Sequence, residues 1–416
     1  MDRLTYGDAD TAAAINALCV AVRVDADLRP DLADRYDFGG LPTTAFLTAS
    51  GEILGGGTFV QPDRLRDALS RLSARPPRLD VVPPSEGNAE EIDADGLTAA
   101  VFDTFDEVHG GFGGAPKFPH TAPVRLALDL YVETADAFML ERAARTLDAM
   151  GWGGLYDDEG GGFFRCAAAS DWSGAQAEKL LPVNAALLDL YLYAGTVASS
   201  ERWFARAVDV VKFIEGKLIA ANGAWRYTEC AAPARQFTDA NAATASAMLH
   251  AARVFDDAAL GKRAIDGLER VLLSTYRPGE GVAHSAVGIR GLLTDHVAMA
   301  AANLDAWEST GNIVYRMMAE ELMHFAVRTM WDPDHGGFGD RAAEADEGSG
   351  VPPCRQVKPF VLNCEAAVVL RRLAEALNDP LFDQRAVATL AAVSGRALAH
   401  GPQAAHYLLA QRAVLR

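Results

Sequence analysis

Short segments rich in glycine and aromatic residues recur along most of this chain, at intervals of roughly 50 to 60 residues. They read HGGFGGAPKF, DDEGGGFFR, ANGAWRY, GEGVAHS and DHGGFGD, and each stands between two stretches with helical periodicity. A repeat of this length is typical of units that bury their apolar faces by stacking on one another or by closing into a ring. The sequence therefore predicts a stacked or closed array of helical pairs.

The helices on the two sides of these segments differ in character. In ERWFARAVDVVKFIEGKLI, which precedes a segment, apolar residues form one stripe, while Arg206, Asp209 and Glu215 are expected to face water. The helices that follow the segments, such as VNAALLDLYLYAG and HVAMAAANLDAW, are apolar on nearly all sides, as buried helices are. Six of each kind predict a mostly α-helical fold, a closed (α/α)6 toroid with the glycine-aromatic loops at one mouth. The outer helices are expected near Asp95, Phe138, Trp203, Lys262, Met317 and Gln384, and the inner ones near Leu126, Leu187, Thr244, Ala300, Val368 and Tyr407.

The first part of the chain alternates between element types over short distances. The residues that follow it, 75–91, are rich in proline and acidic residues, which is typical of a linker. The sequence thus predicts a small α/β domain at 1–74, a linker at 75–91 and the toroid at 92–416. The elements expected in the small domain are a strand at 18–25, a short helix at 29–38, a hairpin from 43–50 and 52–59, and a closing helix at 61–74.

Composition and charge disfavour several classes of partner. The net charge of -18 repels nucleic acid backbones and anionic membranes. The chain does not start with a basic segment followed by an apolar core, and it has no run of about 18 apolar residues, so we expect neither a signal peptide nor a membrane span. Its five cysteines include no C-x-x-C pair and are expected to be reduced and buried, as in a cytoplasmic protein.

The glycine-rich segment GGFGGAPKFPH does not match a phosphate-binding loop. Gly111 and Gly113 have the first spacing of the dinucleotide-binding motif, but Pro116 stands where the third glycine is required. No G-K-[ST] sequence occurs in the chain, and no group of histidines and cysteines has zinc-like spacing. We therefore expect no cofactor and no bound metal, and we expect the glycines to let the chain turn tightly from an outer helix into an inner one.

Four motifs carry a resemblance: GGFGGAPKFP, TLDAMGWGGLYDDEGGGFFR, EKLLPVNAALLDLY and VKPFVLNCEAA. In kind and order they resemble the YyaL-like thioredoxin domain-containing proteins, also described as a spermatogenesis-associated family, over nearly the whole chain. The resemblance implies a thioredoxin-like domain followed by a six-hairpin toroid like those of sugar epimerases and glycosidases. It also implies that the turn GGLPTT carries the thioredoxin cis-proline, which is then Pro42.

The chain departs from the pattern of this family in two places. Family members commonly carry a C-x-x-C motif shortly before a segment that resembles TYGDADTAAAIN, but only MDRL precedes Thr5 here. We expect the true translation start to lie upstream, so that the thioredoxin-like domain as given is truncated and cannot perform dithiol chemistry. In the toroid, Gln176, Val183 and Phe164 replace ionisable residues of the family, which weakens the inference of an intact catalytic site.

Ionisable and aromatic residues in the loops and in the first turns of the inner helices are the candidates for a functional site. Carboxylates serve glycoside hydrolysis, where one acts as acid and the other as nucleophile or base, and histidines serve epimerisation by removing and returning a proton. The candidate catalytic residues are Asp157, Glu178, Asp239, Asp295 and His296. The candidate substrate-binding residues are Lys117, Trp152, Tyr156, Arg165, Lys179, Asn184, Tyr227, His284 and Lys358.

Each candidate also has a structural interpretation. Asp239 and Asp295 stand beside threonines, at positions where helix N-caps belong. His296 is also explained as a hydrogen-bonded residue of the toroid wall, and Lys179 as the partner of a carboxylate. Asparagines recur one to a repeat and are expected to order the loop backbone through their side chains: Asn184, Asn241 and Asn363.

Two classes of function stay open at this point. In the first, the toroid binds a carbohydrate-like small molecule and acts on it as an epimerase, an isomerase or a glycoside hydrolase, an expectation that rests on the fold. In the second, the chain is a non-catalytic binding or scaffold protein with a redox-inactive thioredoxin-like domain, which the replaced ionisable residues favour. Two carboxylates at hydrolase separation, or a histidine pair across a cavity, would favour the first class.

Overall fold

The computed structural model describes residues 1–74, 93–229, 235–342 and 357–415 and divides the chain into two compact units. The first unit consists of Met1–Glu86 with Ala343–Pro359, and the second consists of Gly87–Ala342 with Phe360–Arg416. The linker that the sequence predicts at 75–91 lies outside the described residues. The second unit is called the ring unit from here on.

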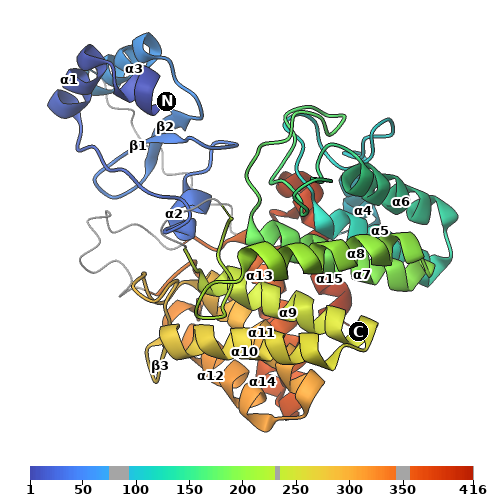
Figure 1. The fold of residues 1–416 in the computed structure, drawn as a ribbon. Helices are drawn as coiled ribbons and strands as arrows, with labels where there is room; N and C mark the ends of the chain where they lie inside the picture. Colours follow the sequence, from blue (N-terminus) through green and yellow to red (C-terminus); the bar gives the residue numbers. More distant parts are fainter. Residues whose placement is uncertain (75–92, 230–234, 343–356, 416) are drawn as a thin grey trace. The chain divides into compact units, whose positions relative to one another are not determined.

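The first unit combines short helices with one β-hairpin. Its elements are η1 (Asp2–Tyr6), a single π-helical turn, then α1 (Ala9–Leu18), α2 (Pro30–Arg35), β1 (Thr44–Leu47), β2 (Ile53–Gly57) and α3 (Pro62–Ala74) (Figure 1). Strands β1 and β2 pair antiparallel with Thr44 opposite Gly57, and the amphipathic helix α3 buries Leu65 and Leu69. The predicted hairpin and the two predicted helices of this region are confirmed.

The strand predicted at 18–25 is wrong. The segment after Leu18 forms neither helix nor strand, and Val20 and Val22 are 92% and 58% exposed. Alternating valines fit a pleated strand, but a strand also needs a neighbour for its backbone hydrogen bonds. Among the described residues, β1 and β2 pair only with each other, so this segment gains no such neighbour from them.

Individual residues of the sequence analysis have mixed outcomes. The Leu41–Pro42 peptide bond is cis, as expected for Pro42. Cys166 and Cys364 are free and buried, as expected, whereas Cys19 is free and exposed. The other two cysteines lie outside the described residues.

The ring unit consists of helices that alternate between an inner and an outer layer. Each of the twelve helices contains the residue near which the sequence predicts it, from Asp95 in the first to Tyr407 in the last. The inner helices are α5 (Thr121–Thr134), α7 (Leu181–Ala198), α9 (Thr238–Phe255), α11 (Leu293–Thr310), α13 (Phe360–Leu377) and α15 (Ala404–Val414). The outer helices are α4 (Ala94–Phe102), α6 (Ala137–Trp152), α8 (Glu201–Phe213), α10 (Ala258–Thr275), α12 (Ile313–Met330) and α14 (Pro380–Ser394).

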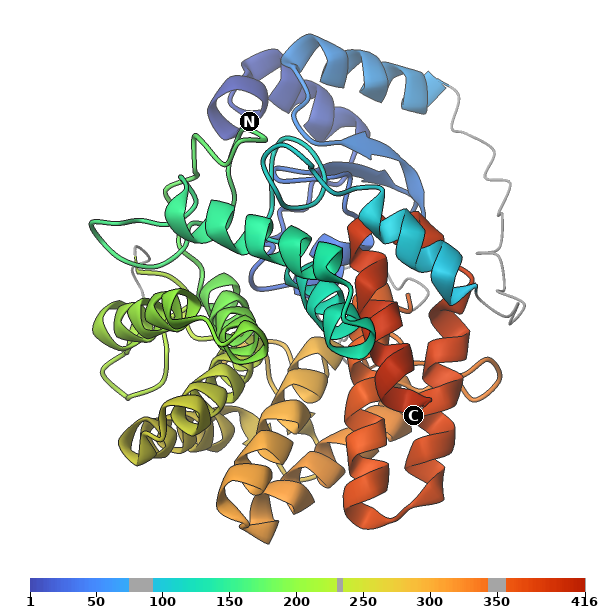
Figure 2. The same ribbon diagram turned by 90° about the vertical axis from the view of Figure 1, so that its right-hand side faces the viewer.

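The inner helices close into a ring. Each contacts the next inner helix along the chain, from α5 with α7 to α13 with α15, and α15 contacts α5. The outer helices α6, α8, α10, α12 and α14 pack against the inner helix that precedes them, while α4 packs against α15. Figure 2 shows the helical pairs following one another from α4 in cyan to the C-terminal helices in red. The closed (α/α)6 toroid that the repeat predicts is therefore confirmed.

Helix α7 is long and apolar enough, by length and composition, to pass a test for a membrane span, with a mean hydropathy of 1.2. The sequence showed no unbroken apolar run here, because Asn184 and Asp189 interrupt it. The helix buries 56% of its residues inside the structure. A core helix of a ring passes the same test, so this result is weak evidence for a span.

Short elements complete the ring unit between its long helices. A π-helical segment, η2 (Ile214–Leu218), follows α8, and a 3-10 segment, η4 (Ala397–Gln403), precedes α15. The strands β3 (Tyr276–Arg277) and β4 (Gly281–Val282) pair antiparallel in the connection between α10 and α11.

Three of the loops that lead from an outer to an inner helix share one backbone structure. Their common sequence is Asp-x-x-x-Gly-Gly-Phe, beginning at Asp106, Asp157 and Asp332. In each loop the aspartate N–H donates to the carbonyl of the second glycine, and the first glycine N–H donates to the aspartate carbonyl. The carboxylate accepts the N–H groups two and three residues further on. Gly110 and Gly111 have φ of 67° and 82°, so glycine is needed here for backbone geometry.

Buried asparagines fasten such loops to the inner helices. Asn184 is fully buried, and its Oδ1 accepts the N–H of Phe163 at 2.7 Å while its Nδ2 donates to the carbonyl of Phe163 at 3.0 Å. The same two bonds join Asn241 to Trp225 and Asn363 to Phe338. The expected role of the asparagines is confirmed, and it corrects the predicted substrate-binding role of Asn184, whose amide is used by backbone groups.

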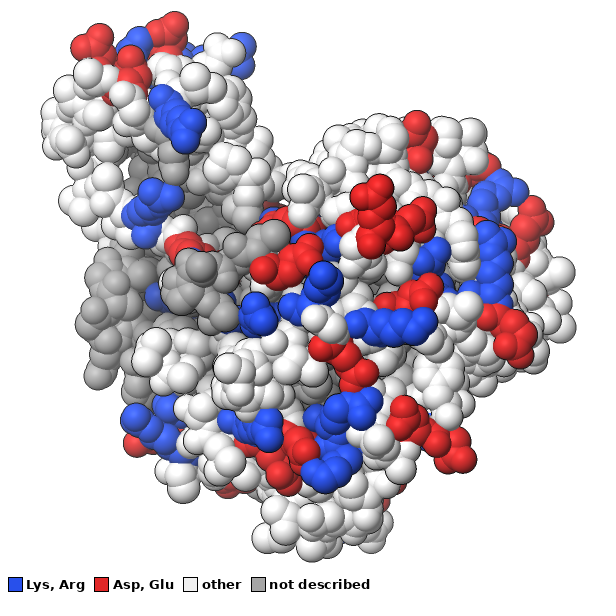
Figure 3. Space-filling model, viewed as in Figure 1, with Lys and Arg blue, Asp and Glu red and all other residues white. Residues whose placement is uncertain are grey.

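Acidic and basic side chains are interspersed on the face of the ring unit that Figure 3 shows. Some of the surface ion pairs join neighbouring outer elements, such as Arg202 with Asp148 and Arg263 with Glu215. Exposed pairs of this kind contribute little to stability. On this face the excess of acidic residues is not collected into one patch.

Candidate functional site

The lysines predicted to bind substrate are buried in the loops. Lys117 is fully buried, and its Nζ donates to Asp106 Oδ2 at 2.5 Å and to the carbonyl of Ser170 at 2.7 Å. Lys179 is 3% exposed and donates to Asp157 Oδ2 at 2.7 Å. The hydrogen bonds from the Gly160 N–H and from Lys179 hold the pKa of Asp157 below its ordinary value. We therefore assign Asp157, Lys117 and Lys179 to loop stability, which corrects their predicted roles in a site.

The predicted aromatic residues lie outside the inner face of the ring. Trp152 ends the outer helix α6, and the guanidinium of Arg206 lies 4.8 Å from its ring centroid and 3.5 Å from that of Tyr156. Tyr227 packs edge-on against the buried ring of Phe237 at 4.8 Å. These contacts are packing between side chains of the protein, so the structure does not bring these three residues to a common site.

Three more candidates stand apart from the inner helices. Glu178 and Arg165 form an accessible pair with 3.4 Å between Oε2 and Nη1, in the segment that precedes α7. Lys358 belongs to the first unit. None of the three contributes to the group of residues described next.

His296 is a buried residue of the ring wall. Its Nδ1 is 2.7 Å from the carbonyl of Leu292, and its Nε2 accepts the N–H of Val282 at 3.2 Å. The imidazole stacks on Phe325 at 4.7 Å. Burial lowers the pKa of His296 to about 4, so it is neutral at pH 7 with both nitrogens engaged. The structural interpretation holds, and the predicted catalytic role of His296 is corrected.

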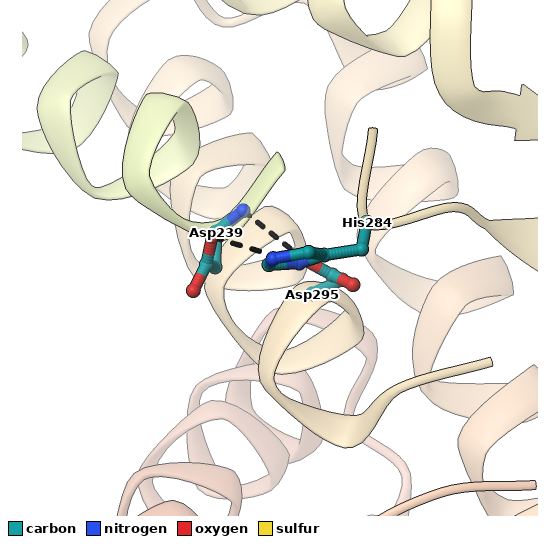
Figure 4. Close-up of side chains that lie close together, drawn as sticks. All are labelled: Asp239, His284 and Asp295. Atoms are coloured by element: carbon teal, nitrogen blue, oxygen red, sulfur yellow. Dashed lines mark hydrogen bonds and ion pairs between the residues drawn. The ribbon is translucent and has the colours of Figure 1, made fainter. Parts of the chain in front are cut away.

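Three predicted residues come together where α9 and α11 begin (Figure 4). Asp239 lies in the first turn of α9, Asp295 in the first turn of α11, and His284 in the segment between β4 and α11. Nδ1 of His284 is 2.9 Å from Oδ1 of Asp295 and 3.9 Å from Oδ1 of Asp239. Oδ1 of Asp295 also accepts the backbone N–H of Asp239 at 3.2 Å. The backbone N–H of Asp239 has no partner within its own helix, so Asp295 of α11 caps the start of α9.

The members of this group differ in how far solvent reaches them. Asp295 is completely buried, and its Oδ2 has no hydrogen-bond partner in the described part of the chain. His284 is 2% exposed, whereas the side chain of Asp239 is 28% exposed. Burial and the nearby charge of Asp295 raise the pKa of Asp239 to about 6. Asp239 is thus the accessible member, and it can be protonated near neutral pH.

Glu365 of α13 is a further carboxylate on an inner helix, within electrostatic reach of Asp239. It is exposed although it lies on an inner helix, and α11 stands between α9 and α13 in the ring. Desolvation by the surrounding ring and then the charge of Asp239 raise the pKa of Glu365 to about 7. Because α11 lies between α9 and α13, this interaction is consistent with both side chains pointing into the ring.

The sequence analysis did not name Glu365. It considered loops and the first turns of inner helices, and Glu365 lies one turn deeper. Glu365 stands two residues after Asn363, whereas Asp239 stands two residues before Asn241, so the two carboxylates do not occupy equivalent positions of the repeat. The repeat pattern therefore carries no signal that marks both carboxylates.

Two histidines stand on the helices that follow α13 around the ring. His120 is the N-cap residue of α5, and His406 lies in the first turn of the neighbouring helix α15. Burial lowers the pKa of both, and the charge of His120 adds to the effect on His406, whose pKa is about 4. Both histidines are therefore neutral near pH 7. We call the first two turns of the six inner helices, with His120, the inner rim.

Asp239, His284 and Asp295 could also hold a metal ion. Each offers one ligand atom, and these atoms lie within 4.8 Å of one another, a donor set that suits a divalent cation such as zinc. In the structure, however, Oδ1 of Asp295 is already bonded to His284 and to the Asp239 N–H, so a cation has to replace these bonds. Their spacing in the sequence carries no metal signal, because the three residues come from separate segments.

The inner rim provides what proton transfer requires. Asp239 and Glu365 are accessible to solvent, and they have pKa values of about 6 and 7. Groups that titrate near the working pH are the most effective acids and bases, because both protonation states are populated. Two interacting carboxylates can share these roles, since ionisation of one opposes ionisation of the other.

Comparison with known sequences finds distant relatives. No protein-family model matches the chain. An uncharacterised protein of Caenorhabditis elegans is 26% identical over 227 residues, which cover 46% of this chain and 31% of the relative. Spermatogenesis-associated protein 20 of Rattus norvegicus is 23% identical over 271 residues, which cover 55% of this chain and 34% of the relative. The chain thus spans about a third of the length of the curated relatives it matches.

Solved structures share the fold of the ring. The cellobiose 2-epimerase of Bacillus thermoamylovorans B4167 is similar with a TM-score of 0.60 at 13% identity, over 70% of this chain and 82% of its own. A D-mannose isomerase has a TM-score of 0.59 at 12% identity, over 79% and 98%. An unsaturated glucuronyl hydrolase specific for heparin has a TM-score of 0.58 at 10% identity, over 77% and 95%. At these identities the likeness establishes the six-hairpin toroid fold of sugar-processing enzymes, and the activity of this chain has to be argued from its own residues.

Proposed function

We propose that the ring unit processes a carbohydrate by acid–base catalysis at the inner rim, with Asp239 and Glu365 as the proton-transferring groups. The observation that carries the proposal is the presence of two accessible carboxylates on inner helices, close enough for the charge of Asp239 to raise the pKa of Glu365. Their raised pKa values allow one to hold a proton while the other is ionised near neutral pH. Sugar epimerases, isomerases and glycoside hydrolases with this fold support a carbohydrate as the ligand.

His284 and Asp295 position the carboxylate of Asp239 in this proposal. Both are buried, and Asp295 binds the backbone N–H of Asp239 while it also bonds to His284. A protonated and an ionised carboxyl group on opposite sides of a sugar form the arrangement used in glycoside hydrolysis. Hydrolysis is therefore the reaction that this geometry favours, and proton abstraction by His120 or His406 is the route that an epimerase would use.

The test is to incubate the purified chain with cellobiose and with mannobiose in D₂O and to identify the products by NMR and mass spectrometry. Hydrolysis releases monosaccharides, whereas epimerisation or isomerisation places solvent deuterium on the carbon next to the carbonyl. Either product supports the proposal if it disappears in Glu365→Gln. Binding without any product would favour the alternative, a non-catalytic binding protein, and absence of binding would contradict a carbohydrate ligand.

We further propose that the first unit is thioredoxin-like and has no dithiol activity. The order of helix α1, the hairpin of β1 and β2, and helix α3 supports this, as does the resemblance of its sequence. The described part of this unit contains a single cysteine, the exposed Cys19. In an insulin-reduction assay we expect the rate with the protein to equal that of dithiothreitol alone, and a faster rate would contradict the proposal.

A further inference from the structure

A second polar cluster reaches from the inner rim into the depth of the ring, with its members on α7 and α9 beyond the first two turns. It consists of Arg125 of α5, Asp189 of α7 and His250 of α9, and it is called the inner cluster below. Nδ1 of His250 is 2.6 Å from Oδ1 of Asp189, and Nη1 of Arg125 is 3.6 Å from Oδ2 of Asp189. Three consecutive helices of the ring thus each contribute one side chain.

The inner cluster faces the interior of the ring. Helix α7 has α5 and α9 as its ring neighbours and the outer helix α8 behind it. Asp189 reaches a side chain on each ring neighbour, so it lies on the side of α7 away from α8. Its side chain is still 45% exposed, and that of Arg125 is 37% exposed. Charged groups that remain accessible inside the ring are available to a ligand.

Neighbouring groups hold the inner cluster in one orientation. The guanidinium carbon of Arg125 lies 3.4 Å from the ring centroid of Tyr193, and its Nε is 3.5 Å from Asp129. The hydroxyl of Tyr193 donates to the same Asp129. Burial alone would raise the pKa of Asp189, but the hydrogen bond from His250 and the nearby cations hold it below its ordinary value. The cluster is therefore ordered, with Asp189 ionised, before any ligand arrives.

The inner cluster suits a ligand that carries hydroxyl groups. Nε2 of His250 has no partner among the described residues, and the side chain is 17% exposed. Oδ2 of Asp189 has room for a donor, since Arg125 approaches it only to 3.6 Å. A hydroxyl group can donate to the carboxylate or the imidazole and accept from the guanidinium. The cluster contains a cation, Arg125, and an anion, Asp189. A polyanionic ligand would be repelled by Asp189 and a polycationic one by Arg125, which favours a neutral ligand.

The separation of His250 from Asp239 sets the length of the ligand. His250 stands eleven residues after Asp239 on α9, which is roughly 16 Å along the helix at 1.5 Å per residue. A single sugar ring is too short to contact both. We propose that the ring binds a linear oligosaccharide, with the hydroxyl groups of one unit on Arg125, Asp189 and His250 while another unit lies at Asp239 and Glu365. This inference rests on the proposed function and specifies the substrate class of the same ring.

The experiment compares the binding of short and long sugars by isothermal titration calorimetry. The wild-type chain is titrated with glucose, cellobiose and cellotriose, and with mannose, mannobiose and mannotriose. In one of the two series we expect the trisaccharide to bind at least about tenfold more tightly than the monosaccharide, because hydrogen bonds to charged groups add to its affinity. His250→Gln and Asp189→Asn are expected to reduce this ratio to below about threefold while the monosaccharide affinity stays the same. Asp189→Asn is also expected to lower the melting temperature, because it removes a carboxylate that is paired with cations.

A matched control comes from an outer helix. His324 of α12 is 42% exposed and pairs with Glu320 at 3.7 Å, so His324→Gln makes the same chemical change away from the ring interior. This variant is expected to keep the full preference for the trisaccharide.

Each other outcome overturns a defined part of the argument. Equal affinity of the wild type for mono- and trisaccharides would overturn the oligosaccharide inference and leave the proposed carbohydrate function standing. The same follows if His250→Gln keeps the full ratio, or if both variants lower the melting temperature and weaken all sugars alike, which is the behaviour of a purely structural cluster. No binding of any of these sugars would overturn the proposed function and the inference with it.

Discussion

The loops and the inner rim of the ring place the same chemical group in opposite surroundings. In the loops, Asp106 and Asp157 each accept two backbone N–H groups and the Nζ of a buried lysine, and both pKa values lie below the ordinary value. At the inner rim, Asp239 and Glu365 make no ion pair with a lysine or arginine of the described residues. Desolvation by the surrounding ring and like charge raise their pKa values to about 6 and 7.

This difference separates structural carboxylates from reactive ones. A carboxylate whose charge is matched by a cation stabilises the fold and stays ionised, so it is a poor acid. A carboxylate whose charge is opposed by its surroundings costs stability, and proteins keep such groups mainly at functional sites. The comparison therefore supports the proposal that the loops of this protein serve stability and the inner rim serves chemistry.

The largest expected effect is on catalysis. Glu365→Gln and Asp239→Asn each remove one proton-transferring group and should lower the rate of product formation by at least about 100-fold. The melting temperature should stay the same or rise, because each change removes a charge that its surroundings oppose. Glu375→Gln, at an exposed position of the same helix as Glu365, is the control and should keep full activity. A variant of Glu365 that retains activity would remove the distinction between rim and loops.

The second-largest effect is expected on the free energy of unfolding, when a buried ion pair of a loop is broken. Lys117→Met leaves Asp106 without its cation in a buried place and should lower the free energy of unfolding by about 3 kcal/mol. Lys262→Met breaks an exposed pair and should cost less than about 1 kcal/mol. Both are measured by urea unfolding. The double change of Lys117→Met with Asp106→Asn should recover part of the loss, and equal costs for the two lysines would show that the loop pair is not structural.

A smaller loss of stability is expected when an asparagine that binds a loop to an inner helix is replaced. Asn184→Ala leaves the buried N–H and carbonyl of Phe163 without partners and should destabilise the chain by about 2 kcal/mol. Asn222→Ala, at an exposed position, should cost less than about 0.5 kcal/mol. Differential scanning calorimetry of the two variants tests this. A tolerated Asn184→Ala would mean that the loop backbone finds other partners.

The architecture of the ring unit could be predicted from sequence because each of its units carries the same local signals. Amphipathic and apolar helices alternate around glycine turns, and twelve helices occur where those signals place them. The strand predicted at 18–25 failed because its alternation was also local, whereas a strand depends on a partner elsewhere in the chain. Periodicity identifies an element reliably when the element satisfies its own backbone hydrogen bonds, as a helix does.

The candidate site could be predicted only in part, for a related reason. The sequence shows that Asp157 and Asp239 both stand near the start of an inner helix, but it does not show that Lys179 neutralises one and that Asp295 opposes the other. Those partners are fixed by contacts between repeats. Glu365 was missed because its significance comes from a carboxylate two inner helices away.

The smallest expected effect is on the pH dependence of stability, which compares a carboxylate of the inner rim with one of the loops. Asp239 has a pKa of about 6 in the folded chain against an ordinary value of 3.8, so between pH 8 and pH 5 the folded state takes up a proton that the unfolded state does not. The contribution of this group to stability therefore rises as the pH falls, by roughly 1 kcal/mol. His296 acts in the opposite sense. Its pKa of about 4 lies below the ordinary 6.5, so the stability it contributes is lost as the pH falls from 7 to 5.

The effect of Asp239 has to be read as a difference between variants, because His296 and other groups titrate in every variant. From pH 8 to pH 5, the free energy of unfolding of Asp239→Asn should fall by roughly 1 kcal/mol more than that of the wild type. Asp157→Asn should show the same pH dependence as the wild type, because the lowered pKa of Asp157 keeps it ionised over the whole range. Urea unfolding at the two pH values measures both. If the two variants changed the pH dependence alike, the carboxylates of the loops and of the rim would belong to one class, and the argument that places the chemistry at the rim would lose its electrostatic basis.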